Sequence, residues 1–307
     1  MKVTVLAGGV GGSRFLRGVR AALRADAPDA RITAVVNTGD DMWLAGLRIT
    51  PDLDTITYAL AGVNDEQRGW GRIGETERVA GELAAFGVGW PWFTLGDLDL
   101  GTHIARTAFL RDGLRLSEAM RRISARWPLG VELLPATDDE VETQVVTDDG
   151  ELHFEEWWTR LHAGPAARAF VQRGVEDAIP APGVLDAIAG ADVVLLAPSN
   201  PVVSIGTILG IPGIRDAVAG TRAPVVGVSP IIGGAVVRGM ADACLTAIGV
   251  ATDAAAVARH YGARRVDGTP SGGLLDGWLV DEADADAVPA LAADGIAARA
   301  VLELALP

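Results

Sequence analysis

Three short clusters of aspartates carry the residue type that could hold a hard cation. They are Asp40 and Asp41, Asp52 and Asp54, and Asp97 and Asp99. Mg²⁺ prefers oxygen ligands and commonly takes one or two carboxylates, with substrate phosphates and waters as its remaining ligands. One of these pairs and a diphosphate substrate would therefore form a Mg²⁺ site. The alternative is that single aspartates cap helices, an explanation that suits one residue better than three clusters.

A glycine-rich segment follows the first apolar run and could approach a phosphate. It contains Gly8, Gly9, Gly11 and Gly12, and Ser13 is expected to cap the helix that follows. Backbone N–H groups at a helix start attract anions, and glycines allow a ligand to come close. The spacing fits neither the dinucleotide-binding pattern, because Arg14 takes the place of the last glycine, nor a P-loop. The alternative is a tight turn without a ligand.

Two further polar loops each follow a predicted buried strand. Ser199 and Asn200 lie in the first loop, and Ser229, Gly233 and Gly234 lie in the second. In open α/β sheets, ligands bind beyond the carboxyl ends of the strands, so both loops are expected to line one crevice. Taken alone, Ser-Asn-Pro is also an ordinary turn sequence.

The elements that must position these residues follow an α/β order. The residue pattern predicts strands at Val3–Ala7, Ile32–Val36, Asp192–Ala197 and Val225–Ser229, and edge strands at Trp278–Val280 and Val301–Leu304. Between them, helical spacing occurs at Pro51–Ala61, Glu75–Phe86, Thr102–Arg111 and Leu116–Arg126, and a small hairpin is expected within about 131–160. We therefore predict a single α/β domain over 1–307, a Rossmann-like, mostly parallel sheet with helices on both faces. Its core spans 1–41 and 181–307, with a mainly helical, substrate-binding insertion at about 42–180.

Composition narrows the class of function. The 307 residues carry 40 acidic and 26 basic groups, a formal charge of −14 that argues against nucleic acid as a partner. Lys2 is the only lysine, so no internal lysine can clamp a phosphate, and Cys244 is the only cysteine, expected to be an inert buried thiol. No apolar run is long enough to span a membrane. These features suit a cytoplasmic enzyme that transfers a phosphoryl-containing group.

Six motifs in order along the chain resemble the CofD/FbiA family of coenzyme F(420) biosynthesis. They are Gly8–Phe15, Val36–Trp43, Pro51–Thr55, Leu95–His103, Ala197–Pro201 and Ser229–Gly234. The family comprises 2-phospho-L-lactate and phosphoenolpyruvate transferases. The resemblance implies a Mg²⁺-dependent transfer from lactyl- or enolpyruvyl-diphosphoguanosine to the ribitol hydroxyl of the deazaflavin Fo, with GMP as leaving group and F(420)-0 or its dehydro form as product. It also permits a homodimer.

The resemblance also implies roles for individual residues. The glycine segment with Ser13, the Ser199-Asn200 loop and the Ser229–Gly234 loop would hold the guanosine diphosphate part. The residues that would contact Fo are Asp54, Thr94, Asp97 and His103, although some relatives carry lysine at the Thr94 position. Asp40 and Asp54 are the expected catalytic carboxylates, because charge neutralisation and positioning dominate phosphoryl transfer. Either could hold Mg²⁺ or orient the attacking hydroxyl. From helical spacing alone, His103 would simply be a packing or capping histidine.

Two choices stay open at the level of sequence. The related gluconeogenesis-factor proteins bind nucleotide sugars and act as regulators, but their loop after the second strand reads Asp-Asp-Gly-Gly-Ser-Ser-Gly, whereas this chain has Asp40–Gly46 as DDMWLAG. The lactyl and enolpyruvyl donors differ at one carbon, and no recognised motif distinguishes them. The aromatic residues of Trp90–Phe93 and Trp157-Trp158 resemble those of the family members that use the enolpyruvyl donor, which favours that donor.

Overall fold

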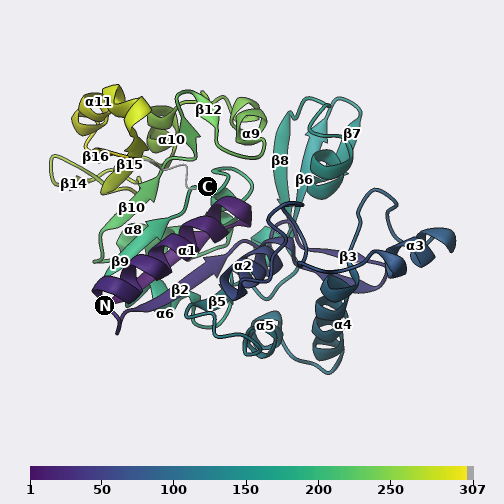
Figure 1. The fold of residues 1–307 in the computed structure, drawn as a ribbon. Coiled ribbons are helices and arrows are strands. Elements are labelled where there is room, and N and C mark those ends of the chain that lie inside the picture. Colours follow the sequence, from purple (N-terminus) through teal and green to yellow (C-terminus); the bar gives the residue numbers. More distant parts are fainter. Residues whose placement is uncertain (303–307) are drawn as a thin grey trace.

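A seven-stranded sheet in which every neighbouring pair is parallel forms the centre of the computed structural model, which describes residues 1–302 (Figure 1). The strand order is β16-β15-β10-β9-β1-β2-β5. The strands are β1 Lys2–Ala7, β2 Arg31–Val36, β5 Glu132–Pro135, β9 Val193–Leu196, β10 Val225–Val228, β15 Gly277–Asp281 and β16 Ala297–Val301. This confirms the predicted α/β class and the parallel sheet.

Alternate side chains of the central strands enter two separate cores. In β1, Val3, Val5 and Ala7 pack on one face of the sheet, whereas Leu6 packs on the other. The first face is covered by α1 Gly9–Asp26, α2 Pro51–Ala61 and α5 Leu116–Ser124. The second core takes in α6 Val184–Ala189, α7 Ile205–Gly210, α8 Ile214–Gly220, α9 Ala241–Ala247, α10 Ala254–Tyr261 and α11 Val288–Ala293. Helices on both faces are therefore confirmed.

The strand order reverses between β1 and β9, and this determines where a ligand can enter. The chain winds outward from β1 through β2 to β5, then returns to β9 and winds the other way. At such a switch point the loops after the two central strands separate and leave a crevice. The glycine segment follows β1 and the Ser199-Asn200 loop follows β9, so two of the predicted binding loops border this crevice.

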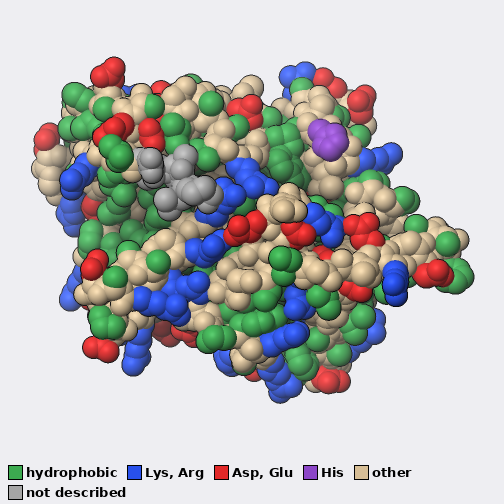
Figure 2. Space-filling view, viewed as in Figure 1, with side chains coloured by type: hydrophobic (Ala, Val, Ile, Leu, Met, Phe, Trp, Pro, Cys, Tyr) green, Lys and Arg blue, Asp and Glu red, His purple; other side chains and the backbone are tan. Residues whose placement is uncertain are grey.

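The stretch predicted as a mainly helical insertion is more varied than expected. It contains α3 Arg78–Ala85, α4 Asp97–Arg111 and a hairpin of β3 Met42–Leu44 with β4 Leu47–Ile49. The small hairpin expected within about 131–160 is confirmed: it is formed by β6 Glu142–Thr147 and β7 Gly150–His153. β5, in the same stretch, joins the main sheet beside β2, and β8 Ala169–Arg173 adds to the hairpin a third strand that the sequence did not predict. The segment that carries α3 projects from the body of the molecule (Figure 1, Figure 2).

Several helix and strand boundaries differ from the predicted ones. α4 begins at Asp97 instead of Thr102, and the carboxylate of Glu75 accepts the backbone N–H of Asp99 in its first turn. α3 begins at Arg78 instead of Glu75. β15 is an interior strand and not an edge, because β16 pairs with it.

The C-terminal strand and the remaining short elements complete the described chain. β16 ends at Val301, and residues 303 and 304 of the predicted Val301–Leu304 strand lie outside the described residues. The short elements are η1 Glu156–Arg160, η2 Val175–Asp177, η3 Glu282–Ala287, and the hairpins β11 Ile231–Ile232 with β12 Ala235–Val236 and β13 Arg265–Val266 with β14 Thr269–Pro270. Across residues 1–302, no helix combines the length and apolar character that a membrane crossing requires.

Candidate active site

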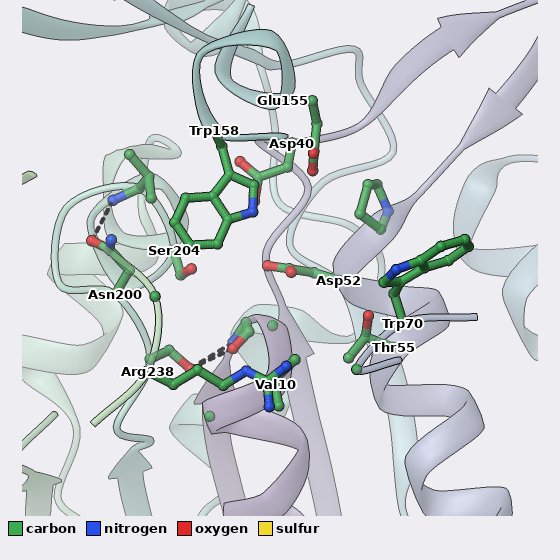
Figure 3. Close-up of a pocket in the computed structure, with 18 of the residues that line it drawn as sticks. Val10, Asp40, Asp52, Thr55, Trp70, Glu155, Trp158, Asn200, Ser204 and Arg238 are labelled. Atoms are coloured by element: carbon green, nitrogen blue, oxygen red, sulfur yellow. Dashed lines mark hydrogen bonds between the residues drawn. The ribbon is translucent and has the colours of Figure 1, made fainter. Parts of the chain in front are cut away.

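A cavity of about 910 Å³ lies beyond the carboxyl ends of the central strands (Figure 3). Its walls come from the starts of α1 and α2, the loops after β2, β9 and β10, the η1 segment and the aromatic stretch before α4. The predicted site residues among its lining are Gly8, Gly9, Gly11, Asp40, Asp54, Thr94, His103, Ser199, Asn200 and Ser229. The structure therefore brings most of the predicted residues to one cavity.

The glycine segment is the first turn of α1 and not a loop that precedes it. The helix begins at Gly9, and Ser13 is not its cap: the Ser13 hydroxyl donates to the Val10 carbonyl from a buried position within the helix. Gly11 is glycine because the backbone of the β9 loop passes against it, where an added Cβ would lie 2.5 Å from the Pro198 carbonyl oxygen. Gly12 and Ser13 lie outside the cavity lining. Gly9 to Gly11 therefore combine close packing with a helix N-terminus that faces the cavity.

The polar side chains of the neighbouring loops are engaged in holding the loops together. The Ser199 hydroxyl accepts the Gly8 N–H at 2.9 Å and donates to the Gly8 carbonyl at 2.7 Å, which joins the loops after β1 and β9. The Asn200 side-chain oxygen accepts the N–H of Val202, and the Ser229 hydroxyl bonds the backbone of Ile231. These residues line the cavity, but their side chains are already hydrogen-bonded within the loops. A ligand would therefore contact mainly their backbone groups.

Gly233 and Gly234 do not line the cavity. They form the turn between β11 and β12, and the Gly233 N–H donates to the carboxylate of Asp284. Asp97 is likewise outside the lining, because its carboxylate is bonded to Thr76. For Gly233 and Asp97, a direct ligand contact would need a rearrangement of existing hydrogen bonds.

Three buried carboxyls, Asp40, Asp52 and Glu155, form what we call the acidic cluster (Figure 3). Asn37 ties two of them together, since its amide nitrogen donates to Asp40 at 3.2 Å and to Asp52 at 2.9 Å. Asp52 also accepts the backbone N–H of Gly9, which links the cluster to the start of α1. One oxygen of Asp40, Oδ1, is buried with no hydrogen-bond partner among residues 1–302.

Among residues 1–302, no basic side chain forms an ion pair with the acidic cluster. Burial, with the neighbouring charges of Asp52 and Glu155, raises the pKa of Asp40 well above its usual range. Burial raises the pKa of Asp52 to about 6 and that of Glu155 to about 7. Carboxyls in such an environment resist ionisation unless a cation is supplied. An oxygen-ligated divalent cation would fit this donor set, with the unpartnered Oδ1 of Asp40 as one ligand atom.

A second group of buried residues, which we call the Arg106 network, carries its own positive charge. It consists of Asp54, Asp99, His103 and the fully buried Arg106. Arg106 forms an ion pair with Asp54, donates to His103 Nδ1 at 3.0 Å and donates to the Arg48 carbonyl at 3.1 Å. His103 Nε2 lies 3.3 Å from an oxygen of Asp99, which also accepts the Tyr58 hydroxyl at 2.6 Å.

The pKa shifts of the two carboxyls differ in direction. Burial raises the pKa of Asp54, and the charge of Arg106 opposes that rise. For Asp99, burial also acts to raise the pKa, but the nearby His103 ring, the hydrogen bond from Tyr58 and the charge of Arg106 outweigh it, so that its pKa is lowered. Groups inside the fold thus stabilise the ionised form of Asp99 and offset part of the cost of burying Asp54.

Ligand atoms of Asp54, Asp99 and His103 lie within 4.8 Å of one another, yet the chemistry of the group is unfavourable for a metal. Arginine can only donate, so His103 Nδ1 must accept the Arg106 hydrogen bond and its lone pair is used. The Asp54 oxygens accept hydrogen bonds from Arg106 and Thr50. The acidic cluster is therefore the better candidate for a cation site.

Aromatic side chains line a further part of the cavity wall. Trp70, Trp92 and Phe93 line it beside Thr94, and Trp92 is stacked on Trp90 with ring centroids 4.7 Å apart. Trp158 enters the cavity near Asp40 and Ser204 (Figure 3), while Trp157 is fully buried and anchors η1 through a hydrogen bond to the Pro165 carbonyl. Flat apolar faces of this kind suit a planar ring system.

Sequence reasoning missed several residues of the site. Glu155 and Arg106 belong to no recognised motif, and Asn37 was seen only as part of the loop after the second strand. Their roles depend on partners 15 to more than 50 residues away in the chain. Cys244 is buried as predicted, and burial raises the pKa of its thiol to about 12, which disfavours the reactive thiolate form.

Comparisons with known proteins agree in sequence and fold. A family model described as 2-phospho-L-lactate transferase CofD matches residues 3–296. A phosphoenolpyruvate transferase of Streptomyces griseus is 56% identical over 305 residues, covering 98% of this chain and 92% of that protein. Proteins of the same name from Thermobifida fusca and Nocardia farcinica are 56% and 53% identical, covering 98% and 94% of this chain and 91% and 86% of their own lengths.

A solved structure supports the fold. A member of the upf0052 family from Bacillus halodurans matches with a TM-score of 0.60 and 20% sequence identity, covering 99% of this chain and 94% of that one. At this level of identity the likeness concerns the arrangement of helices and strands alone.

Proposed function

Because the chain belongs to the 2-phospho-L-lactate transferase CofD family, we propose that it is a phosphoenolpyruvate transferase of coenzyme F(420) biosynthesis. The donor would be enolpyruvyl-diphospho-5'-guanosine, and the acceptor the ribitol hydroxyl of Fo, 7,8-didemethyl-8-hydroxy-5-deazariboflavin. The products would be dehydro-F(420)-0 and GMP. The name shared by relatives at 53–56% identity favours the enolpyruvyl donor over the lactyl donor.

One observation carries the proposal: the start of a helix, the acidic cluster and a group of aromatic side chains all line a single cavity. The start of α1 and the loop after β9 suit the diphosphate and nucleoside of the donor. The aromatic side chains of Trp70, Trp92 and Phe93 suit the planar deazaflavin. The two substrates would then meet near the acidic cluster.

We assign the Mg²⁺ site to Asp40 and Asp52, with Glu155 close by, in place of the pair Asp40 and Asp54 expected from the motifs. Asp40 has the unpartnered oxygen, and both aspartates lie beside the start of α1, where the diphosphate would bind. Mg²⁺ bound there would neutralise charge on the diphosphate and so assist attack at phosphorus. Asn37 holds the two carboxylates in register by donating to both.

We assign to Asp54 the role of positioning the acceptor hydroxyl. It lines the cavity with His103 and Tyr58, and Arg106 and Thr50 hold its carboxylate in one orientation. A rigid polar wall of this kind can orient a polyol chain by accepting its hydroxyl hydrogens. Positioning accounts for much of the rate in phosphoryl transfer.

We also place the enzyme in the cytoplasm. A reducing compartment is compatible with a chain whose one cysteine, Cys244, is buried and unpaired.

The decisive experiment is a transfer assay with the purified protein, Fo and Mg²⁺, and the enolpyruvyl and lactyl donors in separate tubes. Mass spectrometry should detect dehydro-F(420)-0 and GMP in the enolpyruvyl tube, and the relative rates identify the preferred donor. Asp186→Asn, a substitution on the exposed face of α6, serves as a control that keeps the activity. No product in either tube and no binding of Fo would refute the proposal. A thermal shift with a UDP-sugar would then favour the nucleotide-sugar-binding regulator.

A further inference from the structure

Arg238 reaches across the mouth of the cavity between two segments that lie far apart in the sequence. It follows β12, and its guanidinium lies against Gly69, in the segment between α2 and α3. A Cβ atom added at Gly69 would overlap Nη2 of Arg238, so the absence of a side chain at position 69 makes room for the guanidinium. The lining of a small second cavity includes Val10, Arg14, Gly69, Trp70 and Arg238. Its two acidic residues are already engaged, because Asp65 accepts the backbone N–H groups of Gln67 and Arg68 and Glu66 pairs with Arg17.

Arg238 and Arg14 carry positive charges at the cavity, and neither has an ion-pair or hydrogen-bond partner among residues 1–302. Arg68, which also lines the cavity, differs from them: it pairs with Glu77 at 2.6 Å and stacks on Trp70, with its guanidinium carbon 3.8 Å from the ring centroid. In a chain with a formal charge of −14, two uncommitted arginines at one cavity mouth are available for an anion.

The position of Arg238 relative to α1 indicates which part of a ligand it would meet. Figure 3 shows its side chain passing beside Val10, in the first turn of α1, while Asp40 and Asp52 lie on the opposite side of the cavity floor. The cavity thus has a basic side and an acidic side. A diphosphate with a bound divalent cation has the matching arrangement of charge, with the cation towards the carboxylates and free phosphate oxygens towards the arginines.

We propose that Arg238, together with Arg14, binds the diphosphate of the nucleotide donor, and that glycine at position 69 is required because any side chain would displace the guanidinium. The identity of the ligand as a nucleoside diphosphate rests on the proposed function. Arginine suits this role because its planar guanidinium can make two parallel hydrogen bonds to phosphate oxygens. Since negative charge grows on the phosphate of the leaving GMP, the same contact supports the transfer step.

The first test measures the affinity for GDP with Mg²⁺ by titration calorimetry. Arg238→Ala should raise the Kd for GDP about tenfold or more, whereas Arg238→Lys should raise it less and Arg222→Ala, at an exposed arginine away from the cavity, should leave it unchanged. The loss should be smaller for GMP, which has one phosphate fewer. A Kd for GDP within twofold of the wild type in Arg238→Ala would overturn the proposal.

The second test uses two glycines with the same backbone conformation. Gly69 and Gly74 have φ angles of +80° and +77°, but nothing lies within 4 Å of a Cβ added at Gly74. Alanine is strained at both positions, so Gly74→Ala controls for the backbone. Gly69→Ala should weaken GDP binding about fivefold or more relative to Gly74→Ala, and should add little to Arg238→Ala in the double variant. Equal affinities of the two alanine variants would contradict the role assigned to Gly69.

These measurements separate the proposal from the function on which it rests. Wild-type protein that binds GDP in an Arg238-dependent way but transfers nothing to Fo would leave the diphosphate contact standing and refute the transferase. Normal transfer of the phosphoenolpyruvate group by the Arg238→Ala variant would refute the diphosphate contact and leave the transferase standing. Failure of the wild type to bind GDP with Mg²⁺ would overturn both the contact and the choice of donor.

Discussion

The acidic cluster and the Arg106 network line the same cavity and are built from the same kind of side chain, yet their charges are balanced differently. In the network, Asp54 forms an ion pair with Arg106, and Asp99 accepts the Tyr58 hydroxyl and lies 3.3 Å from Nε2 of His103. In the cluster, the charged groups that act most strongly on Asp40 are other carboxyls. A buried charge is costly without a partner, so the network contributes to the fold, whereas the cluster is an arrangement that an added cation would stabilise.

The difference distinguishes carboxylates that are paired with a positive charge inside the fold from those that are not, which burial alone does not. Asp40, Asp52 and Asp54 are all more than 90% buried, with exposed fractions of 5%, 7% and 4%. What distinguishes them is the sign of the neighbouring charge. Uncompensated buried charge in one defined region is the pattern expected where a protein gives up stability for a binding site.

Among these substitutions, removal of the positive charge of Arg106 should have the largest effect on the free energy of unfolding. Arg106→Met leaves Asp54 buried without its counter-charge and should lower the free energy of unfolding by about 3–5 kcal/mol. Arg111→Met, at an exposed position on the same helix, should change it by less than about 0.5 kcal/mol. Urea unfolding measures both. Equal losses in the two variants would show that the network is not held by Arg106.

Removal of a charge from the acidic cluster should leave the fold intact and reduce the reaction. Asp40→Asn keeps the shape of the side chain, relieves repulsion from Asp52 and Glu155, and removes a proposed Mg²⁺ ligand. We expect turnover to fall about a hundredfold to a thousandfold, with Fo binding largely kept and unfolding free energy unchanged or higher. Steady-state kinetics and Fo titration measure the two properties. Near-wild-type rates would exclude Asp40 from the reaction.

A divalent cation should stabilise the protein through the cluster and not through the network. At Mg²⁺ concentrations well above its Kd, the free energy of unfolding should rise by about 1–3 kcal/mol. Asp52→Asn should abolish this gain, whereas Asp99→Asn, in the network, should keep it. The measurement is urea unfolding with Mg²⁺ and with EDTA. A gain lost in Asp99→Asn but kept in Asp52→Asn would reverse the assignment of the metal site.

Without the cation, stability should depend on pH in a direction set by the cluster. The folded pKa values of Asp52, about 6, and Glu155, about 7, lie above those of ordinary carboxyls, so between about pH 4 and 7 the folded state binds more protons than the unfolded state. The stabilisation is fully present below pH 4 and is lost as the pH rises through 7. The slope is at most about 1.4 kcal/mol per pH unit for each extra proton.

Glu155→Gln should flatten the upper part of this pH dependence, because glutamine does not titrate. Urea unfolding in EDTA at pH 5, 6 and 7 measures the slope in the wild type and the variant. A wild-type stability that rises from pH 5 to pH 7 would show that these carboxyls are compensated after all.

The residue pattern was sufficient to predict much of the framework. The apolar runs at Val3–Ala7 and Ile32–Val36 predicted two neighbouring parallel strands, and β1 and β2 pair as expected. The loops after β1 and β9 were predicted to share one crevice, and Ser199 joins them directly. Such predictions succeed because strand pattern and α/β order are local properties that the parallel topology then converts into position.

The pairing of carboxylates could not be predicted in this way. Asp52 and Asp54 were taken as one cluster, but both lie in the first turn of α2, where each residue is rotated by about 100° from the one before it. Two residues apart they point to nearly opposite sides, Asp52 towards Asn37 and Asp40, and Asp54 towards Arg106. The same rotation on α4 directs Asp97 to Thr76 and Asp99 to Tyr58.

By itself, then, the sequence determined the α/β class, the order of the binding loops and the presence of enough carboxylates for a cation. Only the tertiary structure decided which carboxylates meet. In the acidic cluster, Asp40 comes from the loop after β2, Asp52 from α2 and Glu155 from the segment before η1. In the Arg106 network, the positive charge comes from Arg106 on α4. Charge compensation acts over a few ångströms in space, and the residues that provide or withhold it are separated by tens of positions in the chain.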